Sequence, residues 1–443
     1  MTRLVGLDLF RAIAVFGMLV AHVGPAAWTA GDGLGTVHWQ WEVFHSRMPA
    51  MFAFAAGLSL TLGGRSSNDR ATLGARSGGR TTADPTSPVA PTLVRAALLA
   101  ACGGLLTALG TPVVVILASF GLWFALVTPF LRLGARPLFL IAGAWAVLGP
   151  PLSFVLRSTL PAAGPFTNAG PVAGPVAGPI TGPVTDAGEL LWSGLVSGDY
   201  PALTWMPFVL AGLATGRLDL SSARIRVRLG AVGAGLATLA YGGSALFLAT
   251  GGSALLQQSI VPADGLDTAQ QFARIFFRES GVTDTGSWLW LLTPAPHSGS
   301  WADVLGCLGV AALLLAVLLP LGDRLSTPTS TGTDTGSLRV ARVPRIPRIL
   351  RIPLRAVAAS GAMVLSVYAA HIVAMAVITA VTGHSFRGAQ SVWMLLAFTA
   401  ALVAFAALWL ARFRRGPIEE LLARTSALIV RTGRRASGGS SRR

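Results

Sequence analysis

The fold is decided by apolar stretches such as residues 7–22, LDLFRAIAVFGMLVAH. Only Asp8, Arg11 and His22 can ionise in this stretch. Extended to 8–28, the run is long enough to cross the roughly 30 Å of a bilayer's hydrocarbon core as a helix. Because charges interrupt its start and many further apolar runs follow, we predict an uncleaved first span rather than a signal peptide.

The whole chain has the composition of a membrane protein. Of its 443 residues 53% are hydrophobic and 12% are charged, whereas soluble domains carry about 25% charge. We therefore expect an all-α, polytopic integral membrane protein. Its apolar runs predict about ten transmembrane helices, near 8–28, 47–63, 93–109, 112–131, 137–156, 202–217, 227–250, 302–321, 357–381 and 390–412.

The loops between these runs alternate in charge. One set carries arginines, and the other carries acidic residues at 32–42, 186–199 and 264–284. The positive-inside rule makes the arginine-rich set cytoplasmic, so an even number of spans puts both termini in the cytoplasm, with the protein in the plasma membrane. This pattern accounts for the net charge of +16 without nucleic-acid binding, which we do not expect.

The chain divides into spans and connecting segments. A homo-oligomer is compatible with this organisation, and the lipid bilayer is the expected surrounding. The segments are two spans with an outer loop (1–63), a flexible cytoplasmic loop (64–92), spans 3–5 (93–156), a Gly/Pro-rich outer linker (157–201), spans 6 and 7 (202–250), an outer loop (251–301), span 8 (302–321), a basic cytoplasmic loop (322–356), spans 9 and 10 (357–412) and a basic cytoplasmic tail (413–443).

Histidines gather on the expected outer side. Ionisable residues at membrane depth are costly and usually face a cavity or a partner. Arg11 and His22 are about three helical turns apart and share one face, with His22 about 16 Å nearer the outside. Asp8 lies one turn below Arg11 and could pair with it. We interpret this face as the lining of a cavity; the alternative is a snorkelling Arg11 with an incidental His22. The six histidines are His22, His38, His45, His297, His371 and His384.

Several motifs resemble those of known membrane acyltransferases. Leu7 and Asp8, with Arg11 followed after ten residues by His22, resemble the first-helix signature of acyltransferase-3 proteins. The rest of the chain is more similar to a sister group, the heparan-alpha-glucosaminide N-acetyltransferase-like proteins and the YeiB-like bacterial membrane family. These further motifs are His45-Ser46-Arg47 with 52–57, 199–205 with 211–217, Pro296-His297-Ser298-Gly299, 360–368 with His371, and Arg415-Gly416-Pro417-Ile418-Glu419.

The resemblance implies transfer of an acyl group, such as acetyl from cytoplasmic acetyl-CoA, to a hydroxyl or amine of an envelope glycan or glycolipid on the far side. Histidine would act as general base or acyl carrier. The catalytic candidates in order are His22, His38, which lies near the catalytic histidine's place in heparan-type enzymes, and His45. Arginines suit donor phosphates or oxyanion charge. Residues expected to bind donor or acceptor are Asp8, Arg11, Arg47, His297, Tyr368 and His371.

Other interpretations stay open beside this one. His38 and Glu42 are four residues apart, but a third ligand is missing, so we expect acyl-CoA as donor and no metal. A transporter or flippase could use Arg11 and the outer histidines to bind and release a substrate, and it would favour an internal repeat. An inactive scaffold is the third possibility.

Overall fold

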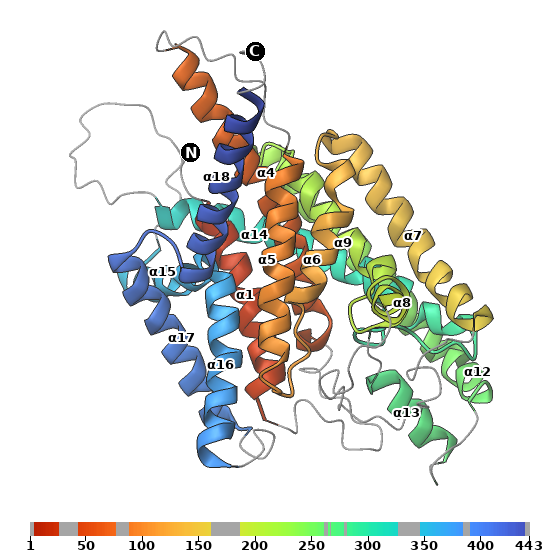
Figure 1. Cartoon of the computed structure of the whole chain (residues 1–443). Helices are drawn as coiled ribbons and strands as arrows, with labels where there is room; N and C mark the ends of the chain where they lie inside the picture. Colours follow the sequence, from red (N-terminus) through yellow and green to blue (C-terminus); the bar gives the residue numbers. More distant parts are fainter. Residues whose placement is uncertain are drawn as a thin grey trace, which may run out of the picture.

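The computed structural model describes residues 4–25, 43–76, 88–160, 187–260, 265, 267–278, 281–326, 346–383 and 390–438. Every regular element within these ranges is a helix, and none of the described residues forms a strand, which confirms the all-α prediction (Figure 1). A helix satisfies its own backbone N–H and C=O groups, as a segment surrounded by lipid must.

Within the described ranges, seven helices are long and apolar enough to cross a membrane, which makes the chain a multi-pass membrane protein. Three more of the expected spans form α4 (Arg47–Arg76), α6 (Leu117–Leu126) and α9 (Ala202–Gly216). With 10 and 15 residues, α6 and α9 are shorter than the roughly 20 residues of a full crossing. The number ten therefore stays a prediction. The seven are α1 (Val5–Val23), α5 (Val89–Thr107), α7 (Ala135–Thr159), the helical segment Ala223–Gln258, which is kinked at Thr250 and Gly251, α14 (Trp301–Ser326), α16 (Val364–Thr382) and α17 (Val392–Arg412).

Shorter helices connect or cap these spans, and α10 to α12 make up the segment Ala223–Gln258. A second, small hydrophobic core formed by Leu256, Phe276, Trp290 and Ala295 holds the segment between 251 and 301 together. The remaining elements are η1 (Thr128–Phe130), α8 (Ala187–Trp192), η2 (Ser193–Ser197), α10 (Ala223–Ala237), η3 (Thr238–Gly242), α11 (Gly243–Phe247), η4 (Leu248–Gly252), α12 (Ser253–Gln258), α13 (Thr268–Arg278), η5 (Trp288–Leu292), α15 (Arg348–Ala362) and α18 (Pro417–Gly438).

The short helix α9 lies at the centre of the bundle. All of its residues except Leu203 are buried. Its backbone packs directly against that of α4. A Cβ atom added at Gly57 would lie only 2.0 Å from the carbonyl oxygen of Val209, and one added at Gly212 would lie 2.0 Å from that of Phe54. Small residues allow this close approach, which lipid-embedded helices use in place of a hydrophobic driving force.

The expected single span 357–381 is interrupted. Met363, with φ −125° and ψ 44°, separates α15 from α16. The carboxylate of Glu419, at the start of α18, accepts hydrogen bonds from the backbone N–H groups of Leu365 at 2.8 Å and Ser366 at 3.2 Å. A negative charge is favourable at the N-terminus of a helix. The beginning of α18 thus fixes the beginning of α16.

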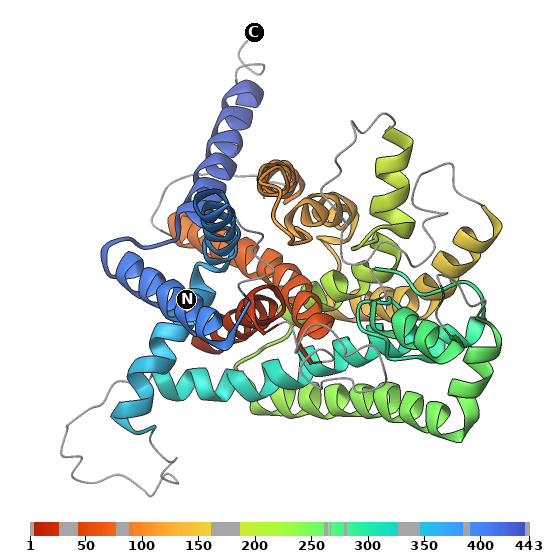
Figure 2. The ribbon, with the colours of Figure 1, turned by 90° about the horizontal axis from the view of Figure 1, so that it is seen from below.

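Different segments of the chain lie at the two ends of the bundle. The C-terminal ends of α4 and α17 and the whole of α18 lie toward one end, whereas α12 and α13 lie at the other (Figure 1). Seen from below, α10 runs along α14, and α15 lies beside the start of α1 (Figure 2). The arginine-rich sequences near α17 and α18 therefore lie at one end of the bundle. The last turn of α1, which carries His22, lies nearer the opposite end.

Candidate active site

The first candidate catalytic residue, His22, meets a second histidine from the far end of the chain. Nδ1 of His22 lies 3.1 Å from Nε2 of His371, and the two rings are nearly parallel, with centroids 5.3 Å apart. His22 is partly exposed, while His371 is fully buried in α16. One of the two nitrogens must carry the shared proton and the other must accept it. The two histidines therefore form a hydrogen-bonded dyad.

Aromatic and amide groups hold this dyad in place. The ring of Tyr368, one turn before His371, lies edge-on to it with centroids 5.1 Å apart. The Tyr368 hydroxyl accepts a hydrogen bond from the backbone N–H of Ile116 at 3.3 Å. Gln390 donates its side-chain N–H to the carbonyl oxygen of His22 at 2.9 Å. These contacts fix the positions of both imidazoles relative to α6 and α17.

A second histidine pair joins the loop before α4 to the loop before α14. The ring centroids of His45 and His297 are 5.6 Å apart. His297 has a left-handed backbone, with φ 65°, and its ring also packs against Tyr200 at 4.9 Å and Trp205 at 5.2 Å. Residues in this conformation often lie at functional sites. Both histidines predicted from the sequence are thus brought together here.

The tautomer of His297 follows from its backbone partner. The N–H of Gly281 is shared between the carbonyl oxygen of His297 at 2.7 Å and its Nδ1 at 2.9 Å. A nitrogen that accepts this N–H carries no proton of its own, so the proton of the neutral ring lies on Nε2. His297 is therefore set up as a hydrogen-bond donor through Nε2 and not as a base.

Burial keeps the second pair neutral. It lowers the pKa of His45 well below its ordinary value, and the neighbouring His297 and His22 lower it further because three positive charges would repel one another. Burial also lowers the pKa of His297, although the carboxylates of Asp199 and Asp303 oppose this effect. Burial raises the pKa of the Tyr200 phenol. At neutral pH the rings of His45, His297 and Tyr200 are therefore uncharged.

Asp303 ties the loops of the second pair together, and sequence reasoning missed it. The hydroxyl of Ser46 donates to Oδ1 of Asp303, and the N–H of Gly299 donates to Oδ2 at 3.2 Å. Ser46 follows His45, and Gly299 lies two residues after His297, so one carboxylate holds both histidine-bearing segments. An acidic residue inside the apolar run 302–321 was the available signal, because such residues are rare at membrane depth.

Arg47 is the first residue of α4 and follows Ser46 directly. Its guanidinium carbon lies 4.5 Å from the centre of the Tyr241 ring, a cation–π distance. The Tyr241 hydroxyl lies 3.5 Å from Sγ of Cys307, a buried thiol. Arg47 also interacts electrostatically with Asp303. It joins the Asp303 network to the segment Ala223–Gln258, and its expected role in binding substrate remains a prediction.

Arg11 lies in a separate cavity nearer the arginine-rich end. This cavity has a volume of about 230 Å³. Arg11 pairs with Asp8, as expected from the sequence, with 3.4 Å between Nη1 and Oδ1, and donates to the hydroxyl of Ser59. Arg95 and Glu419 are the other charged residues of the lining, which is otherwise mainly apolar: Phe52, Ala55, Ala56, Leu60, Leu99, Phe120, Phe124, Gly361, Ala362, Val364, Leu365, Leu422 and Ala423.

The cavity and the histidine dyad are joined by aromatic contacts. Phe52 lines the cavity and packs against Tyr368 with centroids 5.7 Å apart. Tyr368 in turn contacts His371. The structure thus links the Arg11 cavity to His22 through packed side chains. His38, the second catalytic candidate, and His384 lie outside the described residues.

The apolar helices and the buried histidines define a polytopic membrane protein with a polar site inside the bundle. Comparison with protein families identifies it further. Residues 3–248 match the family described as heparan-alpha-glucosaminide N-acetyltransferase, catalytic, and residues 340–428 match a family described as protein of unknown function (DUF418). No curated protein matches the sequence.

The first match covers more than half of the chain, from α1 into η4. The protein belongs to the heparan-alpha-glucosaminide N-acetyltransferase-like family of membrane acyltransferases, as the sequence motifs predicted. It is accordingly a transmembrane acetyltransferase-like protein, and an acyl-CoA donor is what such a family suggests. The second match runs from α15 into α18 and includes His371 and Glu419.

Proposed function

We propose that this protein moves an acetyl group from acyl-CoA in the cytoplasm to a hydroxyl or amine of a sugar or glycolipid on the opposite face of the plasma membrane. The observation that carries the proposal is the His22–His371 dyad, with Nδ1 and Nε2 3.1 Å apart, joined through Tyr368 and Phe52 to the Arg11 cavity. Acyl-CoA would enter by way of that cavity, and its thioester would extend past Phe52 and Tyr368 to reach His22.

His22 is the proposed base. When its Nδ1–H donates to Nε2 of His371, Nε2 of His22 is left with a free lone pair. This nitrogen takes the proton of the acceptor hydroxyl or amine while the acceptor atom bonds to the thioester carbonyl carbon. The carbon–sulfur bond then breaks, and the thiolate of CoA takes the proton from His22 to leave as free thiol. In a two-step variant, Nε2 of His22 bonds to the acetyl group first and passes it on.

His297 would stabilise the transition state. Its Nδ1 accepts the N–H of Gly281, so its Nε2–H is available to a developing oxyanion, and burial lowers its pKa so that it stays neutral. A preorganised donor in a water-poor site is commonly worth 10²–10³ in rate, on the order of 3–4 kcal/mol. The ring of His45 packs beside that of His297.

The sidedness of the proposal rests on charge. The arginines near the end of α17 and the start of α18 support a cytoplasmic location for that end and for both termini by the positive-inside rule. Arg11 then lies nearer the donor side and His22 nearer the acceptor side. The membrane would separate donor from acceptor, and α1 would connect the two.

The test is release of free thiol from acetyl-CoA by purified protein with a panel of amino sugars. We expect His22→Gln and His371→Gln to lower kcat about 10²-fold or more, the contribution typical of a general base. Added imidazole should partly restore a His22→Gly variant. Ser158→Ala, at an exposed hydroxyl of α7, is the control and should keep full activity. Full activity in the His22 variants would overturn the assignment.

A transporter is the second candidate, and one observation favours it. The helix pair α15 and α16 is broken at Met363 inside an apolar run, and interrupted helices often form substrate sites in transporters. Such a protein would carry a sugar across without acetylating it. The two functions differ in whether the molecule that appears on the far side is modified.

A further inference from the structure

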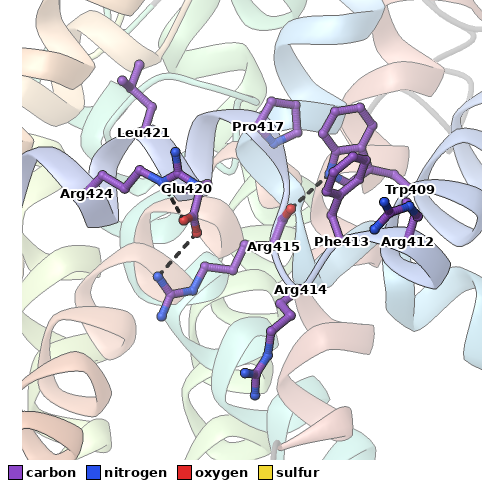
Figure 3. A pocket seen from close by; sticks show the side chains of 9 residues that line it. All are labelled: Trp409, Arg412, Phe413, Arg414, Arg415, Pro417, Glu420, Leu421 and Arg424. Carbon is purple, nitrogen blue, oxygen red and sulfur yellow. Dashed lines mark hydrogen bonds and ion pairs between the residues drawn. The ribbon is translucent and has the colours of Figure 1, made fainter.

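A basic pocket lies where α17 ends and α18 begins, away from the histidines (Figure 3). Its volume is about 950 Å³. Four arginines and one glutamate form its charged lining, and aromatic and apolar side chains form the rest. The lining residues are Trp409, Arg412, Phe413, Arg414, Arg415, Pro417, Glu420, Leu421 and Arg424.

The pocket has an excess of positive charge. Glu420 lies between Arg424, at 2.7 Å, and Arg415, at 3.5 Å. The Arg424 guanidinium keeps the pKa of Glu420 below its usual value, so Glu420 is ionised at neutral pH. Arg412 and Arg414 form no ion pair with another described residue. With one carboxylate against four guanidinium groups, three positive charges remain for a ligand.

The aromatic side chains place this pocket at the boundary between lipid and water. Trp409 packs against Phe413 with centroids 4.5 Å apart and donates its indole N–H to the carbonyl oxygen of Arg415 at 2.9 Å. Tryptophan favours the level of the lipid headgroups. The rest of α17 is apolar and largely exposed, with Trp393 80% and Leu408 73% accessible. Exposed apolar side chains thus line α17 from the pocket to its other end, where they would face acyl chains.

The basic pocket is separate from the Arg11 cavity. Residues 419, 422 and 423 of α18 line the Arg11 cavity, whereas residues 420, 421 and 424 line the basic pocket. At about 100° per residue these two sets lie on nearly opposite faces of the helix. A ligand in the basic pocket would therefore lie outside the donor cavity and beside the lipid-facing side of α17.

We infer that the basic pocket binds the phosphate headgroup of an anionic phospholipid whose acyl chains lie along α17. Guanidinium groups match phosphate oxygens in bidentate geometry, and basic pockets between transmembrane helices on the cytoplasmic side are known to suit such headgroups. The inference does not depend on the proposed acetyl transfer. It has a structural consequence, because α18 carries Glu419, which holds the start of α16.

Native mass spectrometry of the full-length protein in a neutral detergent can test this inference. Phosphatidylglycerol and phosphatidylcholine of equal chain length are added in turn, and bound lipid is counted. We expect wild type to prefer phosphatidylglycerol by about a hundredfold, since each of the three excess arginines contributes about fivefold to anionic lipid binding. Arg412→Gln with Arg414→Gln should lower the affinity for phosphatidylglycerol about thirtyfold while leaving both ion pairs of Glu420 intact.

The matched control is Arg132→Gln with Arg136→Gln, which removes two exposed arginines, one just before α7 and one in its first turn, and should keep the preference. Arg412→Lys with Arg414→Lys should retain most of the binding through charge. An equal loss in the pocket variant and the control would overturn the inference in favour of general surface charge. Displacement of the lipid by 3′,5′-ADP would also overturn it, because the pocket would then be a nucleotide site.

Discussion

His297 combines an unusual backbone with a specific hydrogen bond. Its φ of 65° is uncommon for a residue with a Cβ atom, and its side chain reaches back to accept the N–H of Gly281. Buried imidazole can accept this bond only while Nδ1 is unprotonated. The arrangement should therefore depend on pH.

Because burial lowers the pKa of His297 in the folded protein, its contribution to stability is complete above the unfolded pKa of about 6.5 and is lost as the pH falls toward the folded value. The slope is at most about 1.4 kcal/mol per pH unit for one group. We expect the melting temperature in detergent to fall between pH 7 and pH 5, and less so in His297→Asn, whose side-chain oxygen can still accept from Gly281. His45 adds a similar dependence. An unchanged pH profile in the variant would contradict this account.

At the residue scale, the sequence predicts which histidines belong to the candidate site but not which of them contact one another. The cost of ionisable residues at membrane depth marked His22 and His371 as candidates, and the resemblance to membrane acyltransferases marked His297. Their partners lie up to 349 positions away, and no periodicity connects two helices so far apart in the chain. The φ of His297 and the carboxylate bridge of Asp303 depend on tertiary packing, so they could not be derived from composition or spacing.

At the scale of the element, the contact between α1 and α15 depends on Gly361. A Cβ atom at Gly361 would lie 1.6 Å from the carbonyl oxygen of Asp8, so even alanine requires a backbone shift. This crossing lies beside Arg11 and at the wall of its cavity. The close contact between α1 and α15 therefore helps to set the shape of the Arg11 cavity.

We predict that Gly361→Ala lowers stability by about 1–3 kcal/mol, the usual range for overpacking a core, and widens the separation of α1 from α15. The matched control is Gly104→Ala in α5, where an added Cβ meets no atom within 4 Å; it should be neutral or stabilising by up to about 1 kcal/mol, since alanine favours helix. Melting temperatures of both variants in the same detergent provide the measurement. Equal values would show that the contact tolerates a methyl group.

Apolar runs located the helices well, because hydrophobic length is what a bilayer selects. The ends of the helices and the breaks within them were harder to predict from the sequence. The run 357–381 is apolar on both sides of Met363, so nothing in its composition marks the break, which Glu419 stabilises from a distant helix. Likewise α9, with 15 residues, is short because it is buried by protein on all sides, where full bilayer thickness is not needed.

At the scale of the whole molecule, the arginine-rich segments and the histidine dyad lie toward different ends of the helix bundle. The arginine-rich pocket lies where α17 meets α18, the Arg11 cavity is lined partly by α18, and the His22–His371 dyad lies further along α1 and α16. This order predicts transfer in one direction across the membrane.

The most direct measurement uses proteoliposomes with an amino sugar inside and acetyl-CoA labelled in its acetyl group outside. We predict that labelled acetyl-sugar accumulates inside with wild type and about 10²-fold more slowly with His22→Gln. Permeability controls use vesicles that contain no protein. Sugar that crosses unmodified, or a label that reaches only sugar placed on the same side as acetyl-CoA, would contradict transmembrane acetyl transfer.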